Sequence, residues 1–265
     1  MWLRLRQIAL VANQLRPVLD ELQSVLGLEP CYVDPGVKAF GLENTLLPVG
    51  DELLEVVAPI RAGTAGSRHL ERRGGDGGYM VITQCDDHEP RRKRVAELGI
   101  RKVLEFDVAG EFRDMQLHPK DTGGAFLEID EQQGPRAHDP DGPWHPAGPD
   151  WQRARRTGRV RGIVAAEIQC EEPEKVAARW SEIVELPLRR DPRGRPAIAL
   201  QNATLRFVAI EDGRGEGLGA IDLATVDRAA LVAAARARRA PSSDDQVVLG
   251  GIRMNLQSDI GKPTQ

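Results

Sequence analysis

Two segments of the chain place apolar residues in the same order, first as a short strand-like run and then at helical spacing. In residues 6–30 the apolar positions after the strand recur every three or four residues, and Gly27 is placed to end the helix. The same order returns in residues 161–188, where Pro173 suits a first helical turn. The two segments superimpose without a gap at an offset of 158 residues. The chain is therefore predicted to contain a long internal repeat.

Two weaker copies of this order lie at residues 77–100 and 218–240, again as a strand followed by a helix. Short strand-like runs follow each strand–helix pair. The pattern predicts four β-α-β-β-β modules, giving an α+β fold in which paired modules form two cupped, mostly antiparallel sheets of about eight strands each. One pair is predicted to span 1–131 and the other 159–258. Helices are expected near 15–26, 89–98, 173–184 and 228–239.

Residues 132–158 separate the two pairs of modules. They are rich in Pro, Gly, Asp and His and show no periodicity, which predicts an irregular linker. Trp144 and Trp151 in this linker are expected to dock on a domain surface, since free linkers seldom keep two tryptophans. Residues 259–265 are predicted to form a tail.

The run "LERRGGDGG" at 70–78 has the glycines of a phosphate loop but lacks the Lys-Ser/Thr pair that completes one. It is interpreted as a flexible connector between modules. Arg68, Arg72 and Arg73 in or beside it are interpreted as solvated surface, with a grip on an acidic substrate tail as the alternative.

Composition and charge narrow the classes of function. The chain has 265 residues, 41% of them hydrophobic and 29% charged, with a net charge of −4. A general nucleic-acid binder is usually basic, so this class is not favoured. Three separated cysteines without a CxxC motif favour a reducing compartment over a disulfide framework. No stretch approaches the roughly 20 apolar residues of a membrane span, and the N-terminus does not resemble a signal peptide. The sequence predicts a cytoplasmic protein that binds neither nucleic acid nor membrane.

The segment "GGAFLEID" at 123–130 contains a carboxylate where a strand is expected to be half-buried. Apolar residues alternate there with Phe126, Glu128 and Asp130, which is the period of a strand. Asp130 is interpreted as the fraying end of the strand, whereas Glu128 lies in its middle. Because an unpaired buried carboxylate is costly, Glu128 is expected to face water, a partner or a metal.

Three stretches carry a resemblance to a known family: "GDELLEVVAPI" (50–60), "GGYMVITQCDD" (77–87) and "LHPKDTGGAFLEID" (117–130). They are similar to the corresponding stretches of methylmalonyl-CoA epimerases. These enzymes belong to the vicinal oxygen chelate superfamily, together with glyoxalase I, extradiol dioxygenases and bleomycin-resistance proteins. The resemblance reaches motif level over 3–131 and rests on the internal repeat over 159–258. It implies the same cupped, paired-module architecture.

The resemblance also implies a divalent metal held by one residue from each of four strands, with positions left open for two substrate oxygens. Matched by position, three of the ligands are Gln7, Glu55 and Glu128. The fourth place falls on Met80 or Val81, where the histidine of the family is missing. Mg, Mn, Zn, Ni, Co and Fe are the metals that such a site implies, and no organic cofactor is implied.

Alternation along two strands supports a shared pocket for these side chains. Gln7 is expected to share one face of its strand with Leu5 and Ala9, and Glu55 likewise shares a face with Leu53. In the second pair of modules the internal repeat places other side chains at the ligand positions: Ala165, Phe207, Ile221 or Asp222, and Asn255. These residues make no metal site, so the second domain is predicted to be a degenerate partner or a lid for the first.

Three functions remain open from the sequence. A metal-assisted lyase or isomerase would use Glu128 or Glu55 to move a proton next to a carbonyl of a small oxygenated substrate. A metal-free binding or resistance protein would hold a small molecule in the same cup without chemistry. A metal-free enzyme would combine Glu128 with Tyr79 or His118. The sequence leaves open the identity of the substrate and whether the cups are completed within one chain or in a homodimer.

Overall fold

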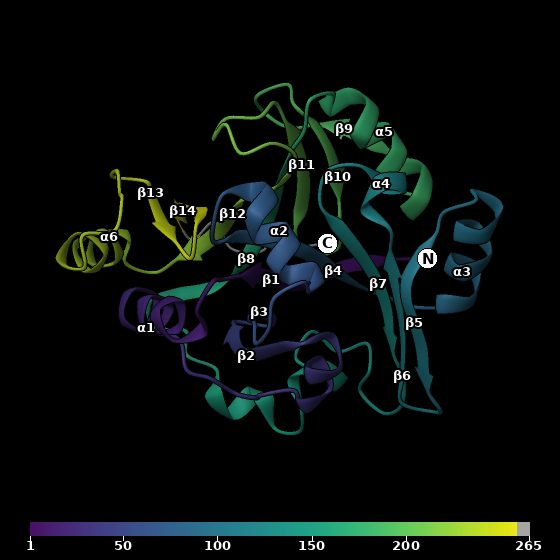
Figure 1. Ribbon diagram of the computed structural model, residues 1–265, viewed down its shortest axis with the longest axis horizontal. Coiled ribbons are helices and arrows are strands. Elements are labelled where there is room, and N and C mark those ends of the chain that lie inside the picture. The colour runs from purple at the N-terminus through teal and green to yellow at the C-terminus, as the bar shows by residue number, and fades with distance from the viewer. Residues whose placement is uncertain (259–265) are drawn as a thin grey trace.

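The computed structural model describes residues 1–258 and has an α+β fold built on two mixed β-sheets of seven strands each (Figure 1). The predicted tail at 259–265 lies outside the described residues. The strands of the first sheet are β1 (Leu3–Val11), β2 (Leu42–Val49), β3 (Glu52–Pro59), β4 (Gly77–Cys85), β5 (Lys102–Val108), β6 (Phe112–Leu117) and β7 (Phe126–Gln132). Those of the second sheet are β8 (Val160–Gln169), β9 (Leu188–Arg190), β10 (Pro196–Ala199), β11 (Thr204–Val208), β12 (Gly217–Thr225), β13 (Gln246–Leu249) and β14 (Ile252–Ser258).

The helices lie between these strands in the order that the repeat predicted. They are α1 (Leu15–Leu26), α2 (Ala65–Arg73), α3 (His88–Glu97), α4 (Pro119–Thr122), α5 (Pro173–Val184) and α6 (Arg228–Ala237). Three short 3₁₀ segments are η1 (Pro35–Phe40), η2 (His145–Ala147) and η3 (Trp151–Ala154). The four helices expected near 15–26, 89–98, 173–184 and 228–239 are therefore present. The strand-then-helix repeat at 161–188 is present as β8 and α5.

Each sheet joins two modules through their first strands. The first sheet has the order β2-β3-β1-β4-β7-β6-β5, in which β1 and β4 pair antiparallel at the centre. The second sheet has the order β13-β14-β12-β8-β11-β10-β9, with β8 and β12 antiparallel at its centre. Parallel pairs occur once per module, between β1 and β3, β4 and β7, β8 and β11, and β12 and β14. The remaining pairs are antiparallel, as predicted.

Each sheet has seven strands rather than the expected eight because one strand of the first module and one of the fourth are reduced to single bridges. Tyr32 pairs with Leu46, and Ser242 pairs with Val247. Pro30 and Pro35 flank the first bridge, and Pro241 precedes the second. Proline has no N–H to give to a ladder, so neither segment extends into a strand.

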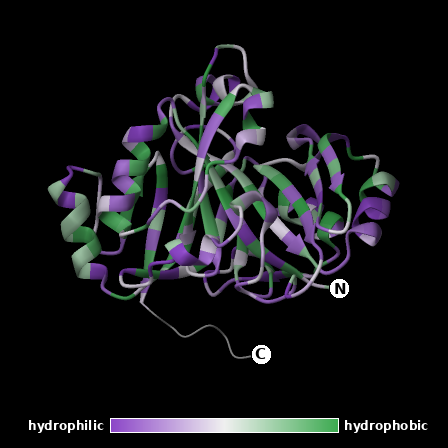
Figure 2. Ribbon diagram, turned by 90° about the horizontal axis from the view of Figure 1, so that it is seen from below, coloured by the Kyte–Doolittle hydropathy of each residue, from purple (hydrophilic) through white to green (hydrophobic). Residues whose placement is uncertain are grey.

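The two sheets share one hydrophobic core on the faces that they turn toward the helices. Along the central strands apolar and polar residues alternate, so that one face of each strand joins this core (Figure 2). Helices α1, α3, α5 and α6 contribute the apolar side chains that close it. α1 contacts α6 at one end of the molecule and α3 contacts α5 at the other (Figure 1). The first module therefore packs against the fourth, and the second packs against the third.

The segment interpreted as a flexible connector at 70–78 is largely ordered secondary structure, and that interpretation is wrong. α2 runs through Arg73, begins where the Thr64 side chain accepts a hydrogen bond from the Ser67 N–H, and ends at Gly74. Gly74 has a φ of 70°, the left-handed conformation in which glycine commonly ends a helix. The sequence signals for this helix were the capping residue Thr64 and the terminal glycine Gly74. They were not recognised because the residues between them are mostly charged.

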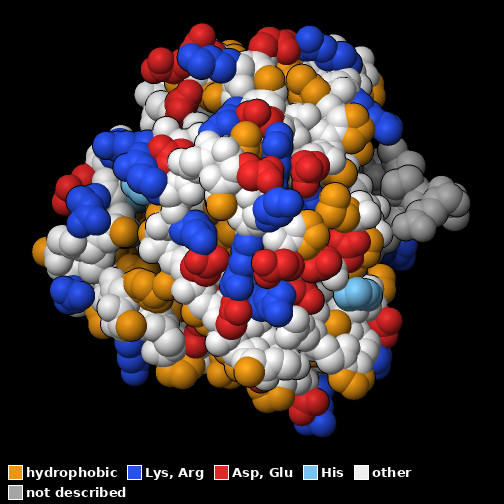
Figure 3. Space-filling model, turned by 90° about the vertical axis from the view of Figure 1, so that its right-hand side faces the viewer, with side chains coloured by type: hydrophobic (Ala, Val, Ile, Leu, Met, Phe, Trp, Pro, Cys, Tyr) orange, Lys and Arg blue, Asp and Glu red, His pale blue; other side chains and the backbone are white. Residues whose placement is uncertain are grey.

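The surface carries both signs of charge in close mixture. On the face that includes α3 and β5, cationic and anionic side chains are interspersed (Figure 3). Arg92 pairs there with Glu105 and Asp107, and Arg101 pairs with Asp121. Within residues 1–258, no helix is long and apolar enough to cross a membrane.

Candidate functional site

Gln7 and Glu55 lie together on the face of the first sheet opposite α1, α3, α5 and α6, which we call the first cup. A β-bulge between Leu5 and Gln7 shifts the alternation of β1 by one position. Leu5 therefore joins the helix-covered core, whereas Ala9 faces the first cup. The expectation that Leu5 shares a face with Gln7 is wrong for this reason. Leu53 does face the first cup, on the same side as Glu55.

The carboxylate of Glu55 is held by two carboxamides. Gln7 Nε2 donates to Glu55 Oε2 at 2.9 Å, and Asn44 Nδ2 donates to Glu55 Oε1 at 2.6 Å. Burial raises the pKa of Glu55, and these two hydrogen bonds partly oppose the rise. Both oxygens of this carboxylate therefore have partners within the chain.

The interdomain segment 132–158 fills the first cup. Trp144 is 1% exposed, and its Nε1 donates to Gln7 Oε1 at 2.9 Å. The Arg6 guanidinium lies over the rings of Trp144 and Trp151, 5.4 and 5.2 Å from their centroids. These contacts fix the segment against the sheet. The two tryptophans are docked as expected, and what they cover is the interior of the first cup.

Glu128 belongs to a different group of side chains, with Asp114 and Asp130. Glu128 and Asp130 are two residues apart on β7, so both point into the first cup. β6 pairs antiparallel with β7 and brings Asp114 to the same face. One carboxylate oxygen from each residue lies within 4.8 Å of the others. We call these three residues the acidic triad.

The acidic triad is buried, and four of its six carboxylate oxygens lack hydrogen-bond partners. Glu128 is 4% exposed and Asp130 is 0% exposed, so Asp130 is not the fraying end that the sequence suggested. One oxygen of Asp114, one of Glu128 and both of Asp130 are buried without a hydrogen-bond partner. Among residues 1–258, none of the three forms an ion pair with arginine or lysine. Such buried, uncompensated carboxylates are costly unless they bind protons or a cation.

Burial and mutual repulsion shift the titration of the whole triad. Burial raises the pKa of Asp114 to about 7. Burial first, and then the neighbouring carboxylates, raise the pKa values of Glu128 and Asp130 well above their ordinary range. Without a cation, the triad therefore keeps protons at neutral pH, shared among three coupled groups.

Ile82 separates Gln7 from Glu128. It pairs with Gln7 on one side of β4 and with Glu128 on the other, so the two polar side chains lie two strands apart. At ordinary strand spacing their Cα atoms are roughly 10 Å apart. Met80, one of the two places expected for the missing histidine, lies on the face of the first cup, and Val81 lies in the core. The structure thus joins Gln7 to Glu55 directly and groups Glu128 with two carboxylates that the sequence did not single out.

The donor atoms of the acidic triad suit a hard divalent cation. Three carboxylates supply oxygen ligands only, which Mg, Mn and Ca prefer. Their unpartnered, buried oxygens fit an ion of this class, because a cation would neutralise charge that no side chain compensates. His118, an alternative ligand or acid–base partner in sequence, caps α4 instead, and its Nδ1 accepts from the Lys120 N–H at 3.2 Å. Tyr79, the other alternative, contacts the rings of His69 and Phe126.

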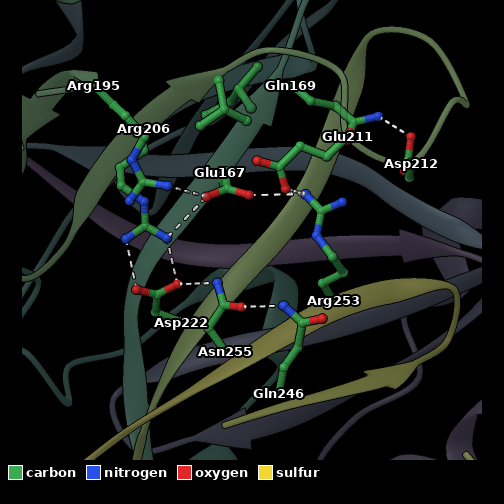
Figure 4. Close-up of polar contacts among 12 residues, drawn as sticks. Glu167, Gln169, Arg195, Arg206, Glu211, Asp212, Asp222, Gln246, Arg253 and Asn255 are labelled. Atoms are coloured by element: carbon green, nitrogen blue, oxygen red, sulfur yellow. Dashed lines mark hydrogen bonds and ion pairs between the residues drawn. The ribbon is translucent and has the colours of Figure 1, made fainter. Parts of the chain in front are cut away.

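The corresponding face of the second sheet, which we call the second cup, holds an ion-pair network (Figure 4). Arg206 donates to both oxygens of Asp222 at 2.7 and 2.6 Å, and Asn255 donates to the same carboxylate at 2.8 Å. Arg253 donates to Glu167 at 3.0 Å. Each buried carboxylate here has a guanidinium partner, so this cup lacks the uncompensated charge of the acidic triad.

Strand register corrects one position of the second cup. Ala165 pairs with Asp222 and Asp222 with Asn255, in the same row as Gln7, Ile82 and Glu128 of the first sheet. The place of Glu55 is taken by Arg206. Phe207, expected at that place, instead lies in the core, where its ring is 5.5 Å from that of Trp180. The offset of 158 does not hold across the loops between β8 and β11, which differ in length from those between β1 and β3.

Comparison with known proteins bears on the fold. No protein-family model matches the sequence, and no curated protein shows significant similarity to it. A hypothetical protein from Staphylococcus aureus aligns over 97% of this chain and 99% of its own, with a TM-score of 0.64 at 11% identity. Methylmalonyl-CoA epimerase from Mycobacterium tuberculosis aligns over 51% of this chain and 90% of its own, with a TM-score of 0.43 at 21% identity. The enzyme from Streptomyces coelicolor, in complex with 2-nitronate-propionyl-CoA, covers 49% and 98%, with a TM-score of 0.44 at 19% identity.

Proposed function

We propose that this chain, whose sequence resembles the vicinal oxygen chelate superfamily and whose fold is that of a hypothetical protein from Staphylococcus aureus, binds a divalent cation through Asp114, Glu128 and Asp130. We further propose that it acts as a metal-assisted lyase or isomerase on a small oxygenated substrate. The observation that carries the proposal is the acidic triad itself, three buried carboxyl groups with unpartnered oxygens. A bound cation would supply a Lewis acid that polarises a substrate carbonyl.

Within this proposal the three carboxylates have different roles. All three would hold the cation, and Glu128 would also carry a proton. Glu128 pairs across the strands with Gln116, which is only half-buried. A carboxylate beside the substrate is a suitable base for a proton next to a carbonyl, and Glu128 lies at the Gln116 edge of the triad. We therefore assign proton transfer to Glu128.

Glu55, the other carboxylate of the sequence-based hypothesis, is assigned a positioning role. Both of its oxygens accept hydrogen bonds from Gln7 and Asn44, and Gln7 in turn binds Trp144. A proton acceptor that already has two donors is a poorer base than one with a free oxygen. Glu55 therefore supports the segment that closes the first cup.

A second candidate is a metal-free binding protein. The observation that favours it is the position of Trp144 inside the first cup, where its Nε1 donates to Gln7 Oε1. Gln7, one of the ligand positions implied by the family resemblance, is therefore bonded to the chain itself and not open to a metal. In that case the acidic triad would remain protonated, and the protein would bind a small molecule without converting it to a product.

Manganese binding separates the two candidates. The metal-assisted proposal expects protein purified without added metal to take up one Mn²⁺ per chain, measured by the loss of the free-ion EPR signal. Glu128→Gln and Asp130→Asn should each weaken binding at least tenfold, because each removes one anionic ligand. The exposed Asp244→Asn is the matched control and should bind as the wild type does. Absence of Mn²⁺ binding by the wild type would favour the binding protein.

Proton abstraction can be tested without knowing the substrate. In D₂O, the metal-loaded protein should exchange deuterium into C–H bonds next to the carbonyl in at least one member of a panel of small oxo acids and thioesters, followed by NMR. Glu128→Gln should abolish this exchange, whereas Asp244→Asn should not. Exchange that survives Glu128→Gln would assign the base to another residue.

A further inference from the structure

A groove of about 1040 Å³ lies outside both cups, where the two halves of the chain meet. Its walls are the C-terminal end of α2, the turn at 119–124 before β7 and the loop at 213–216 before β12. The first two walls belong to the first sheet and the third belongs to the second. A groove of this size is large enough for a small-molecule ligand.

Cationic side chains predominate in the lining of the groove. Arg72, Arg73, Lys120 and Arg214 contribute four positive charges. The acidic residues are Glu71 and Glu216, and the latter already accepts hydrogen bonds from the Gly124 and Glu171 N–H groups at 3.4 and 3.0 Å. Asp212, beside the 213–216 loop, pairs with Arg73 at 3.5 Å, so the positive balance of the groove rests on Arg72, Lys120 and Arg214, in a protein whose net charge is −4.

Two of these arginines build the groove and hold its walls together. Arg214 donates to the carbonyl oxygens of Arg73 and Gly75 at 2.7 and 2.8 Å, and Arg73 donates to the carbonyl oxygen of Arg214 at 3.1 Å. Arg73 is 2% exposed, and its Nε is buried without a partner. This reciprocal contact fixes the spacing between α2 and the 213–216 loop and leaves one guanidinium N–H unsatisfied.

The other two cations remain available at the rim. Arg72 and Lys120 are exposed, and within the described part of the chain neither pairs with a carboxylate. Arg72 contacts His69 Nδ1 at 2.9 Å. Burial lowers the pKa of His69 to about 4, so its ring is neutral near pH 7 and can accept this hydrogen bond. The contact adds no negative charge, so the Arg72 charge is not neutralised. Arg72 and Lys120 can therefore close on an anion from opposite walls.

The floor of the groove is backbone rather than side chain. A Cβ added at Gly74 or Gly215 would meet no atom within 4 Å, and both glycines have a positive φ that other residues rarely adopt. The Gly74 N–H already donates to the Glu71 carbonyl oxygen at 3.3 Å, so the open backbone gives a ligand room rather than hydrogen-bond donors. The donors come from the cationic side chains, whose guanidinium and ammonium groups suit phosphate or carboxylate oxygens.

We infer that this groove is a binding site for a small polyanionic molecule that carries phosphate or carboxylate groups. Arg72 and Lys120 bind the charged groups from the two rims, over a floor built by Arg73 and Arg214. The site shares no residue with the acidic triad, so anion binding in the groove can be tested independently of metal binding by the triad. An aromatic series of His69, Tyr79 and Phe126, with ring centroids 5.0 and 5.1 Å apart, begins at the Arg72 contact of His69 and ends two residues before Glu128 on β7.

The test is a titration of the full-length protein with pyrophosphate and, separately, with citrate, followed by isothermal calorimetry at low ionic strength without added divalent metal. We expect saturable binding of one ligand per chain. The double variant Arg72→Glu, Lys120→Glu should weaken it at least tenfold, and Arg72→Lys, Lys120→Arg should retain most of it. Tighter binding of pyrophosphate assigns the site to phosphates, and tighter binding of citrate assigns it to carboxylates.

The matched control is Arg16→Glu, Lys93→Glu, which changes the net charge by the same amount at exposed positions of α1 and α3. It should bind within threefold of the wild type. Equal weakening by both double variants would show a general charge effect and overturn the proposal. Absence of binding by the wild type at millimolar pyrophosphate and citrate would overturn it as well.

Discussion

At the scale of single residues, Glu128 shows what a sequence pattern can and cannot reveal. Alternation along 125–130 correctly put Glu128 on the face opposite the apolar residues. Its partners Asp114 and Asp130 were not predicted, because the register between β6 and β7 is a tertiary property. Asp130 was expected at a fraying end, but β7 continues to Gln132 and buries it. The acidic triad therefore emerges only when the two strands are paired.

The raised pKa values of the acidic triad predict how stability depends on pH in the metal-free protein. In the unfolded chain these carboxyl groups titrate near pH 4. In the folded protein the pKa of Asp114 is about 7, and those of Glu128 and Asp130 are also raised. The folded state therefore binds more protons between about pH 4 and 7, so the free energy of unfolding falls as pH rises through this window. Urea unfolding at pH 5.5 and pH 8 should show the higher stability at pH 5.5.

Asp130→Asn is the matched variant for this pH prediction. It removes one buried charge with little change in shape, so it should stabilise the metal-free protein at pH 8 by on the order of 1 kcal/mol. Saturating Mn²⁺ should reverse the pH trend in the wild type, since the metal binds the deprotonated carboxylates. Stability that rises steadily from pH 5.5 to 8 in the metal-free wild type would mean that the triad is ionised without a cation.

At the scale of elements, regular segments were predictable and irregular ones were not. α1 and α5 follow directly from apolar stripes with glycine or proline at their ends, and both lie where they were expected. The bulge at the start of β1 was not predictable, since it depends on how β1 pairs with β4. The segment 132–158 lacks periodicity, so the sequence could indicate that its tryptophans dock but not that they fill the first cup.

The burial of Trp144 predicts that the interdomain segment is part of the folded core. Trp144→Ala should lower the free energy of unfolding by about 3–5 kcal/mol, because it empties a large buried volume. Trp144→Phe keeps a ring against Phe112 but leaves Gln7 Oε1 without its donor, and should cost about 1–3 kcal/mol. Urea unfolding measures both. A loss below 1 kcal/mol for Trp144→Ala would show that the segment leaves the cup in solution.

Contact between β4 and β12 predicts a strict requirement for glycine at position 78. A Cβ at Gly78 would lie 2.3 Å from the backbone oxygen of Leu218, which is far closer than atoms approach. Gly78→Ala should therefore separate the two sheets locally and cost about 1–3 kcal/mol. Gly77→Ala is the matched control, since its Cβ would meet only the flexible end of Arg214 at 3.1 Å. Equal thermal stability of the two variants would contradict this packing.

At the scale of the whole molecule, the internal repeat predicted two similar sheets but not the different arrangement of charged side chains in their cups. The first sheet concentrates uncompensated carboxylates, and the second pairs each buried carboxylate with a guanidinium. In the second sheet Arg206 takes the place of Glu55 and donates to both oxygens of Asp222. Matching along the repeat placed Phe207 there, one residue beyond Arg206, because loop lengths differ between the halves. Sequence therefore gives the architecture, and strand register decides which cup can hold a cation.

The most direct test of the central claim is anomalous diffraction at the manganese edge from crystals soaked in Mn²⁺. The account predicts a peak among Asp114, Glu128 and Asp130, with carboxylate oxygens roughly 2.0–2.6 Å from the ion, the range for oxygen ligands of divalent cations. The peak should be absent from crystals of Asp130→Asn, which loses an anionic ligand. A peak beside Gln7 and Glu55, or none near the acidic triad in the wild type, would contradict the account.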